Sequence, residues 1–427
     1  MTGIGETLYQ WVSEVYPHRR SLSSPGTIQT LEFLKGKLPN LKTHEFPSGQ
    51  KVFDWTIPPE WHVESAFLED GSGVRILDYE NHALHLVGYS IPVDQSLSLD
   101  ELQTHLHSLP EQPSAIPYVT SYYQPRWGFC LTHDQRLKLV PGKYRALIES
   151  RFIPGVLRVG ELFVEGETED EILFSTYICH PMMANNESSG IVVTTALAQW
   201  VSQLERRRFS YRFLFAPETI GSIAYLSQNL PQLQKNLKAG FVVTCVGDDR
   251  DYSYLSSRAE DSLADRAARH VLQYHHPSYK TYSFLERGSD ERQYCSPGVD
   301  LPVCSIMRTK YGQYPEYHSS LDNLSVVSPS GLEGSFEAYK KCIMALEANT
   351  HYRRRGPCEP HLSSRGLYPS LSKKGSASNT RTLMNLLAYF DGKRDLIEVC
   401  DKIGADLIES LPIIESLLEH ELIEVVE

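Results

Sequence analysis

The spacing of apolar residues changes along the chain, and each change predicts a different kind of element. Residues 1–40 carry apolar positions at helical spacing between Leu8 and Val15, which predicts an amphipathic helix at the start. Between about 45 and 150, short runs of alternating apolar and polar residues are separated by turn residues. The Asp-Gly-Ser-Gly stretch at 70–73 separates two such runs as a hairpin turn would. This second zone therefore predicts a small β-rich unit.

The β-rich zone is also dense in aromatic side chains, for which there are two interpretations. Packing inside the unit's own core is favoured over stacking against a ligand, because large apolar side chains are usually buried. The residues concerned are Trp55, Trp61, Tyr122, Tyr123, Trp127 and Phe129.

From 151 to 352 the pattern changes to apolar runs that alternate with helical stretches. The runs lack polar alternation, as strands covered on both faces do. They lie at 172–179, 211–217, 240–247 and 301–307. Apolar residues at helical spacing in 191–207 and 260–276 predict helices between these strands. The alternation predicts an α/β core with a mainly parallel or mixed sheet.

The last part of the chain combines an expected linker with a compact helical tail. Residues 353–380 are rich in Pro, Gly, Ser and basic residues, which predicts a partly extended linker. In 381–427, Gly392 and Gly404 interrupt three short helical patterns before a β-prone end. That order predicts a winged helix-turn-helix.

These zones predict three structural units joined in one chain. The α/β core is expected to comprise residues 1–44 and 151–352, with a β-rich inserted domain at 45–150 between its two parts. The linker at 353–380 then leads to the winged helix-turn-helix at 381–427.

Composition narrows the possible functions. The chain has 427 residues, of which 41% are hydrophobic and 22% are charged, values that exclude a disordered chain, a collagen-like repeat and a coiled coil. It has no run of about 18 apolar residues, so no membrane-spanning helix is expected. The N-terminal segment lacks the basic and apolar regions of a signal peptide. The eight cysteines form no CxxC pair, which favours reduced thiols in a cytoplasmic protein.

The distribution of charge argues against nucleic acid as a partner. The net charge is −12, from 41 basic and 53 acidic residues, and the tail at 381–427 alone carries −7. A surface of that sign repels a duplex, so we interpret the tail as a module for homo-oligomer formation or for a protein partner. The linker carries +5 and lies between the tail and an acidic body, so we expect the tail to dock on the body.

Residues with catalytic potential follow three of the expected strands. His180, Glu218 and Asp248 each come after an apolar run. The carboxyl ends of parallel strands meet in one crevice, where ligands bind. Imidazole and carboxylate groups bind zinc, and a further carboxylate can handle the proton of an attacking water. The sequence therefore predicts a zinc hydrolase site at this crevice.

Four local sequences contain these candidates and add others. They are CHPMMANNESSG with His180 and Glu187, APETIGSIAYL with Glu218, ERGSDERQYCSPG with Asp290, and YGQYPEYHSSLDN with His318 and Asp322. Taken singly, each is also compatible with a structural role, such as a carboxylate placed near a helix start. Their combination and order are more specific.

In this order, the four sequences resemble the zinc aminopeptidase superfamily, peptidase clan MH. A closer similarity is to bacterial aminopeptidase-like proteins that carry a β-rich insert and a C-terminal winged helix-turn-helix. It extends to the segments FDWTIPPEW and IPYVTSYYQPRWGFC, so it covers nearly the whole chain. The resemblance implies a zinc-aminopeptidase-like core that cleaves a peptide or amide bond.

Three positions depart from the two-metal enzymes of that superfamily. Asn186 stands where a bridging aspartate is expected, Thr244 where the next strand carries an aspartate, and Pro217 where a pair of glutamates begins. A neutral amide is a poor bridge between two dications. These losses of ligand charge favour one zinc ion over two.

The resemblance then implies a single zinc ion held by His180, Glu187 and His318, with one position open for water. Asp290 is either a further ligand or a residue that holds its turn. Glu218 is expected to be the general base that takes a proton from the bound water.

Substrate contacts are expected from Asn186, Arg287, Arg292 and Arg308, with surface ion pairing as the alternative for the arginines. The expected substrate is a small peptide or an amide-containing metabolite. An amidase or deacetylase acting on a sugar would use the same water activation. A different hypothesis is a regulator or scaffold that has kept the fold, lost the chemistry and acts through its tail.

Overall fold

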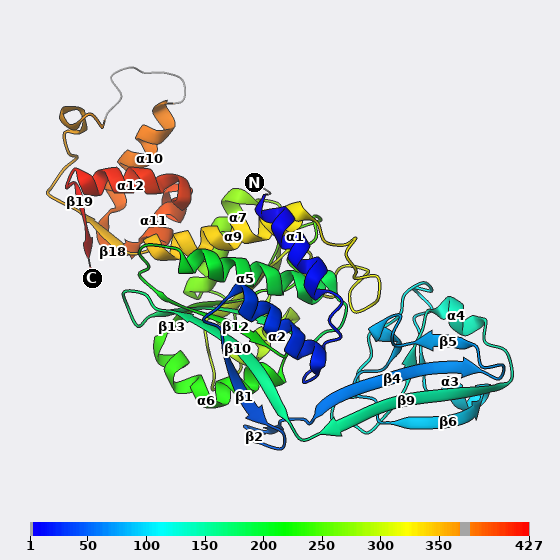
Figure 1. The fold of residues 1–427 in the computed structure, drawn as a ribbon. Helices are drawn as coiled ribbons and strands as arrows, with labels where there is room; N and C mark the ends of the chain where they lie inside the picture. The colour runs from blue at the N-terminus through cyan, green and yellow to red at the C-terminus, as the bar shows by residue number, and fades with distance from the viewer. Residues whose placement is uncertain (1–2, 368–375, 427) are drawn as a thin grey trace.

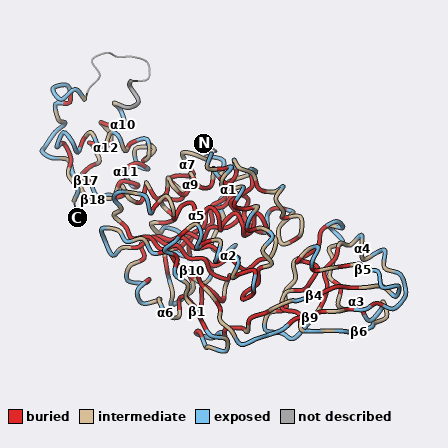
Figure 2. Tube along the Cα trace, viewed as in Figure 1, coloured by how far each residue is buried: buried red, intermediate tan, exposed pale blue. Residues whose placement is uncertain are grey.

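A central α/β core carries one additional unit on each of two sides. The computed structural model describes residues 3–367 and 376–426. In Figure 1 the β-rich unit lies to the right of the core, and the C-terminal unit lies at the upper left. Buried backbone is concentrated in the core, whereas long stretches of the two outer units are exposed (Figure 2).

An eight-stranded mixed sheet runs through the core. In spatial order its strands are β1 (Lys42–Pro47), β10 (Val156–Val164), β12 (Ser210–Ala216), β11 (Glu171–Tyr177), β13 (Leu237–Val242), β16 (Val303–Met307), β14 (Ser253–Leu255) and β15 (Lys280–Tyr282). The four strands β12, β11, β13 and β16 are parallel, as the apolar runs predict. Strand β10 joins β12 antiparallel, and β14 joins β16 antiparallel.

Alternate residues of the central strands face opposite sides of the sheet. Phe174 and Phe213 pack on one side, whereas their neighbours Leu173 and Leu214 pack on the other. The first side is covered by α1 (Ile4–Val15), α2 (Pro25–Lys37), α5 (Ser189–Ser202), α7 (Leu263–His275) and α9 (Pro329–Ala348). The second side is covered by α6 (Ile220–Asn236) and α8 (Glu291–Tyr294). The sheet is therefore enclosed between helices (Figure 1).

The β-rich unit is built on a four-stranded antiparallel sheet. Its spatial order is β5 (Arg75–Asp78), β4 (Glu60–Asp70), β9 (Lys143–Ile153) and β6 (Val93–Ser98). Shorter elements complete it: β2 (Lys51–Val52), β3 (Trp55–Thr56), η1 (Ala83–His85), α3 (Leu99–Gln103), β7 (Leu106–His107), β8 (Phe129–Cys130) and α4 (His133–Leu137). Strands β4 and β9 form a long ribbon that leads away from the core (Figure 1). The predicted turn at 70–73 joins β4 to β5 and is confirmed.

The C-terminal unit begins with a strand that the sequence pattern did not predict. Its sheet has the order β18 (Asp391–Asp395), β17 (His351–Arg354) and β19 (Ile423–Val426), and its helices are α10 (Ser376–Tyr389), α11 (Leu396–Ile403) and α12 (Leu407–Glu419). Residues 353 and 354, assigned to the linker, thus belong to the middle strand, and α10 starts before residue 381. Only Tyr352 of β17 is buried, so this strand has almost no apolar pattern. The expected linker contains η4 (Leu362–Arg365), and its residues 368–375 lie outside the described residues.

The C-terminal unit is held against helix α7 of the core. His270 is buried, its Nδ1 lies 2.6 Å from Oδ1 of Asp401, and its Nε2 accepts the Leu407 N–H at 2.9 Å. Arg266 of the same helix forms an ion pair with Asp395. Docking of the tail on the body therefore agrees with the expectation from charge. The cation on the body side of this contact is Arg266 of α7, while Arg353 and Arg355 of the expected linker form ion pairs with Glu424 of the tail.

The helices and the cysteines can be compared with what the composition predicts. None of the helices in the described part of the chain is long and apolar enough to cross a lipid bilayer. All eight cysteines are free thiols, of which seven are buried and Cys358 is exposed.

Candidate functional site

A cavity of about 420 Å³ opens at the carboxyl ends of the parallel strands. Cys179 and His180 follow β11, Glu218 follows β12, and His318 comes from the loop before α9. The cavity is lined by Leu22, Trp55, Tyr118, Thr120, Tyr122, Tyr123, Cys179, His180, Glu218, Thr219, Ile220, Arg292 and His318. The crevice predicted from strand ends therefore exists, and the β-rich unit supplies one of its walls.

His180 is held in a defined orientation by Glu187. The Nδ1 atom of His180 lies 2.7 Å from Oε2 of Glu187, and that oxygen also accepts the backbone N–H groups of Cys179 and His180 at 2.9 and 2.6 Å. The other carboxylate oxygen accepts a hydrogen bond from Nε of the buried Arg20 at 2.6 Å. Burial lowers the pKa of His180, but the Glu187 hydrogen bond and charge outweigh it and raise that pKa overall. The Nε2 atom is left to face Glu218, 3.6 Å away.

A one-turn π-helix carries Asn186 and Glu187 into the interior. This element, η2 (Ala184–Ser188), lies directly before α5, and such turns recur at functional sites. Asp322 accepts the backbone N–H groups of Asn185 and Asn186 at 2.7 and 2.9 Å. Its burial raises the pKa of the Asp322 carboxyl to about 6. Asp322 therefore fixes this turn.

The turn that presents Glu218 is supported by Asp290. Thr219 adopts a left-handed φ of 65°, and its backbone N–H donates to Oδ1 of Asp290 at 2.7 Å. Ser222 donates to the same oxygen at 3.0 Å. Burial raises the pKa of Asp290 to about 7, with a further contribution from the Glu218 charge. Since Asp290 is absent from the cavity lining, the geometry favours the second of its two expected roles, that of holding a turn.

Burial also shifts the pKa values of Glu218 and His318, which both line the cavity. It raises the pKa of Glu218, while the charges of His180 and Arg292 oppose that rise. For His318, burial lowers the pKa to about 3, with the His180 charge adding to the effect, so its imidazole is neutral. The His318 ring stacks on Tyr317 with centroids 3.9 Å apart, and its centroid lies 5.3 Å from that of His180.

The structure separates the residues expected to contact substrate. Arg292 lines the cavity and donates from Nη2 to the Thr219 hydroxyl at 2.7 Å. Arg287 lies outside it, over the Phe284 ring at 4.7 Å. Arg308 is buried elsewhere and donates to the Asp251 carbonyl at 2.8 Å. Only the first of these arginines is placed to meet a ligand in this cavity.

Asn186 lies behind the cavity in a neutral hydrogen-bonded network. It is fully buried, and its Oδ1 accepts a hydrogen bond from the Tyr177 hydroxyl at 3.3 Å. The same hydroxyl contacts Thr244, whose own hydroxyl donates to the Asn186 carbonyl at 2.7 Å. The two positions where the resemblance expects carboxylates are thus joined by neutral groups. Asn186 does not reach the cavity wall.

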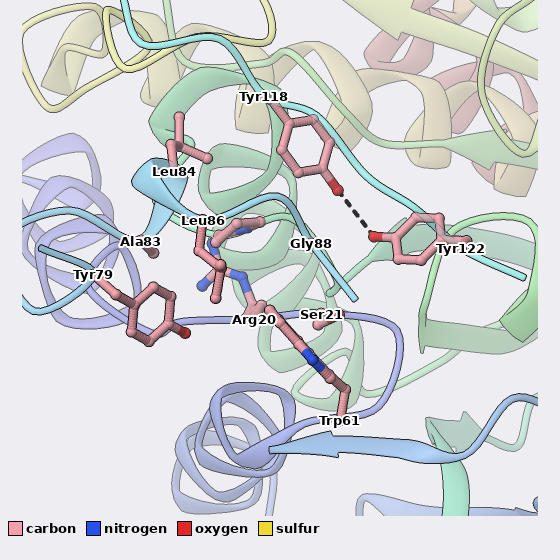
Figure 3. A pocket seen from close by; sticks show the side chains of 11 residues that line it. Arg20, Ser21, Trp61, Tyr79, Ala83, Leu84, Leu86, Gly88, Tyr118 and Tyr122 are labelled. Carbon is pink, nitrogen blue, oxygen red and sulfur yellow. Dashed lines mark hydrogen bonds between the residues drawn. The ribbon is translucent and has the colours of Figure 1, made fainter. Parts of the chain in front are cut away.

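Sequence reasoning missed the tyrosine pair over the histidines. The hydroxyls of Tyr118 and Tyr122 point toward each other and are 3.0 Å apart (Figure 3). The Tyr118 ring centroid lies 5.2 Å from that of His180 and 5.3 Å from that of His318. Arg20, whose Nε donates to the His180 carbonyl at 2.9 Å, was also missed, because it is 160 residues away from His180 in sequence. The sequence signals for this pair were the aromatic density of the β-rich zone and the segment IPYVTSYYQPRWGFC, which contains both tyrosines.

The aromatic residues of that zone divide between the two interpretations. Trp61 and Phe129 are buried, as core packing requires. Trp55 and Tyr123 are 38% and 50% exposed, and both line the cavity. The interpretation as core packing therefore does not hold for Trp55 and Tyr123, which are exposed at the cavity.

Cys179, His180 and Glu187 offer ligand atoms within 4.8 Å of one another, a spacing compatible with a metal ion. However, the same carboxylate accepts hydrogen bonds from the cationic Arg20 and from two backbone N–H groups. These positive groups oppose a second cation at that point. The hydrogen bonds therefore describe a carboxylate that orients His180 and leaves its Nε2 facing the cavity.

Comparison with known proteins places the chain in a family. Residues 9–349 match the family described as a domain of unknown function, DUF4910, and residues 350–425 match a winged helix-turn-helix. The chain belongs to the DUF4910 family. A relative from Clostridium acetobutylicum is 39% identical over 424 residues, which cover 99% of this chain and 97% of the relative. That relative carries a provisional description as a polysaccharide biosynthesis protein with an aminopeptidase-like domain.

Solved structures confirm the fold of this DUF4910 protein. A crystal structure from Clostridium acetobutylicum, provisionally described as a peptidase, superposes with a TM-score of 0.93 at 38% identity, covering 99% of this chain and 97% of that one. A zinc aminopeptidase from Bacillus subtilis superposes with a TM-score of 0.61 at 12% identity, covering 80% and 95%. The aminopeptidase-like α/β fold with a winged-helix tail, predicted from the sequence, is confirmed.

Proposed function

We propose that this DUF4910 protein is a zinc-dependent hydrolase that cleaves a peptide or amide bond in the cavity at the strand ends. The observation that carries the proposal is the presentation of His180. Its Nδ1 is held by Glu187, so its Nε2 faces a cavity that also contains His318 and Glu218. Imidazoles oriented by a carboxylate in this way are typical zinc ligands.

We propose that one zinc ion binds at this cavity. His318 is neutral at physiological pH, so its lone pair is available to a metal. His180 and His318 would hold the ion, and Glu187 would orient His180 instead of binding the metal directly. A bound zinc ion supplies a water of lowered pKa. A second ion has less support, because Asn186 and Thr244 are neutral and hydrogen-bonded to each other.

Glu218 is the proposed general base. Its carboxylate lies 3.6 Å from Nε2 of His180 and is 20% exposed, so it faces the space where a water and a substrate would meet. Burial raises its pKa, which makes it a better proton acceptor than an exposed carboxylate. It would take a proton from the water and pass it to the leaving amine. Arg292 at the cavity wall would bind a carboxylate or carbonyl oxygen of the substrate.

The Glu218→Gln variant tests this assignment. We expect turnover of aminoacyl nitroanilides to fall at least about 100-fold, the usual contribution of a general base, while zinc content by elemental analysis is retained. Glu337→Gln on the exposed side of α9 is the control and should leave turnover unchanged. Unchanged turnover in Glu218→Gln would contradict the base assignment. A purified protein that neither contains nor takes up zinc would contradict the metal assignment.

A second candidate has the same chemistry and a different substrate. The description of the Clostridium relative mentions polysaccharide biosynthesis, which favours removal of an acyl group from an amino sugar. Parallel assays with N-acetyl amino sugars and aminoacyl nitroanilides would decide between the two. If neither class is hydrolysed by zinc-loaded protein, the scaffold hypothesis, which the neutral pair Asn186 and Thr244 favours, would take their place.

The C-terminal unit is proposed to bind a protein or a second copy of the chain. Residues 381–427, the part of this unit after the expected linker, carry a net charge of −7, which opposes DNA, and helix α12 exposes Glu409, Glu415 and Glu419. Salt-sensitive retention of the protein on duplex DNA would contradict this. We also propose that the protein works in the reducing cytoplasm, since all eight of its cysteines are free thiols.

A further inference from the structure

A second cavity, of about 330 Å³, lies in the β-rich unit beside the catalytic cavity. Tyr123 lines both, so the two cavities share a wall. We call the second one the insert subsite. Its lining includes Ile57, Pro58, Tyr89, Ile91, Tyr123 and Phe152. None of its lining residues is charged.

Two of the hydroxyl groups that line the insert subsite are engaged within the protein. The hydroxyl of Ser121 donates to the carbonyl groups of Gly88 and Tyr89 at 3.0 Å each. The hydroxyl of Tyr89 donates to the Pro59 carbonyl at 3.1 Å. An occupant therefore meets mainly rings and hydrocarbon. This wall matches an apolar group and presents no charged side chain to pair with a charged one.

Two tyrosines that line the insert subsite adopt a backbone conformation of raised energy. Tyr89 and Tyr123 both have a φ of 62°, in the left-handed region that residues other than glycine rarely adopt. Such conformations persist where the surrounding structure enforces them and often occur at ligand-binding sites. Tyr123 and Phe152 are nevertheless 50% and 36% exposed, so part of each ring remains accessible to a ligand.

We propose that the insert subsite binds a large apolar side chain of the substrate, next to the bond that is cleaved. Because Tyr123 lines both cavities, they are adjacent, and the proposal places one substrate across this ring with a group in each cavity. This inference rests on the proposed function for its choice of a peptide or amide substrate. It assigns substrate selection to the β-rich unit, while the α/β core supplies the reacting groups.

Phe152→Ala is the informative variant, because Phe152 lines only the insert subsite. Purified Glu218→Gln protein supplied with zinc is titrated calorimetrically with alanyl-alanine amide, phenylalanyl-alanine amide and alanyl-phenylalanine amide. We expect at least one phenylalanine-containing amide to bind about 10-fold more tightly than the alanine compound, a usual value for filling an apolar pocket. Adding Phe152→Ala should remove most of that advantage.

Phe163→Ala is the matched control. Phe163 of β10 is 40% exposed, close to the 36% of Phe152, and lies outside the lining of both cavities. It should leave the preference for phenylalanine intact. Equal binding of the three amides, or a preference that survives Phe152→Ala, would overturn the inference. An intact preference with no hydrolysis of any of the three amides by the unmodified protein would instead count against the proposed function.

Discussion

The two units added to the α/β core meet it in different ways. The β-rich unit reaches the carboxyl ends of the strands, where Tyr118 and Tyr122 pack over the candidate histidines. The C-terminal unit docks on α7, and none of its described residues lines the catalytic cavity. The first unit shares the hydrophobic core on the α6 side of the sheet, and the second shares the core on the α7 side.

This difference places the β-rich unit at the catalytic cavity and the described part of the C-terminal unit away from it. Ligands bind at the carboxyl edge of a parallel sheet, so a unit that reaches this edge can alter substrate choice. A unit on an outer helix can be lost or modified with little effect on the site. The comparison is therefore testable, because variants on the two sides should have effects of different kinds.

The largest effect on stability and zinc affinity is expected at the buried ion pair between Arg20 and Glu187. Arg20→Ala leaves the fully buried Glu187 carboxylate without its ion-pair partner, which should lower the free energy of unfolding by about 3–5 kcal/mol. Zinc affinity should fall by about 10- to 100-fold, because the orientation of His180 is loosened. Chemical denaturation and zinc titration measure the two effects.

Arg19→Ala is the control for that variant. Arg19 pairs with Glu80 at the surface, with side chains 33% and 63% exposed, and such pairs contribute at most about 1 kcal/mol. An Arg20→Ala protein as stable as Arg19→Ala would show that the buried pair does not hold the site together.

A smaller effect is expected at the interface with the C-terminal unit. His270→Ala leaves the Leu407 N–H and Asp401 without their partner, at a cost of about 1–3 kcal/mol. Limited proteolysis should cut the C-terminal unit faster, while turnover per folded molecule stays the same. His420→Ala, at an exposed histidine of the same unit, should change neither. A fall in turnover with His270→Ala would break the proposed separation of the two sides.

The smallest effect is expected on the pH dependence of stability, through His82 of the β-rich unit. Burial, together with the His85 charge, lowers the pKa of His82 to about 4, and the neutral Nδ1 accepts the Leu84 N–H at 3.2 Å. The unfolded chain, with an imidazole pKa near 6.5, binds the proton first. The stability contribution is therefore complete above that pH and is lost as pH falls toward 4.

The acid effect should amount to about 1 kcal/mol after solvent screening is considered. His82→Asn keeps an acceptor for the Leu84 N–H and cannot be protonated, so its stability should depend less on pH between 6.5 and 4. Denaturation curves recorded across that range for both proteins make the comparison. Identical pH dependence would show that His82 is not the group that titrates.

Much of the core could be predicted because its strands are buried on both faces. Apolar runs such as 172–179 and 211–217 coincide with β11 and β12, and their ends locate His180 and Glu218. Strand β17 was missed because a strand with one buried residue has no such pattern, even in the middle of its sheet. Strand prediction from sequence is thus strongest where burial is most complete.

The candidate site was less predictable than the fold. Spacing placed Glu187 near His180 but could not show that it approaches Nδ1 and leaves Nε2 free. The partner of Glu187, Arg20, lies in the connection between α1 and α2, and no local pattern links the two. Arg287 and Arg308 had the right charge, but one lies on Phe284 and the other donates to a backbone carbonyl. Side-chain direction is a property of packing that a linear motif does not carry.

The distribution of thiols has a practical consequence. Seven cysteines are buried and Cys358, which follows β17 at the base of the C-terminal unit, is exposed. A maleimide dye added to the native protein should therefore attach at one position without any engineered cysteine. Fluorescence anisotropy of that dye would then report attachment and release of the C-terminal unit in real time.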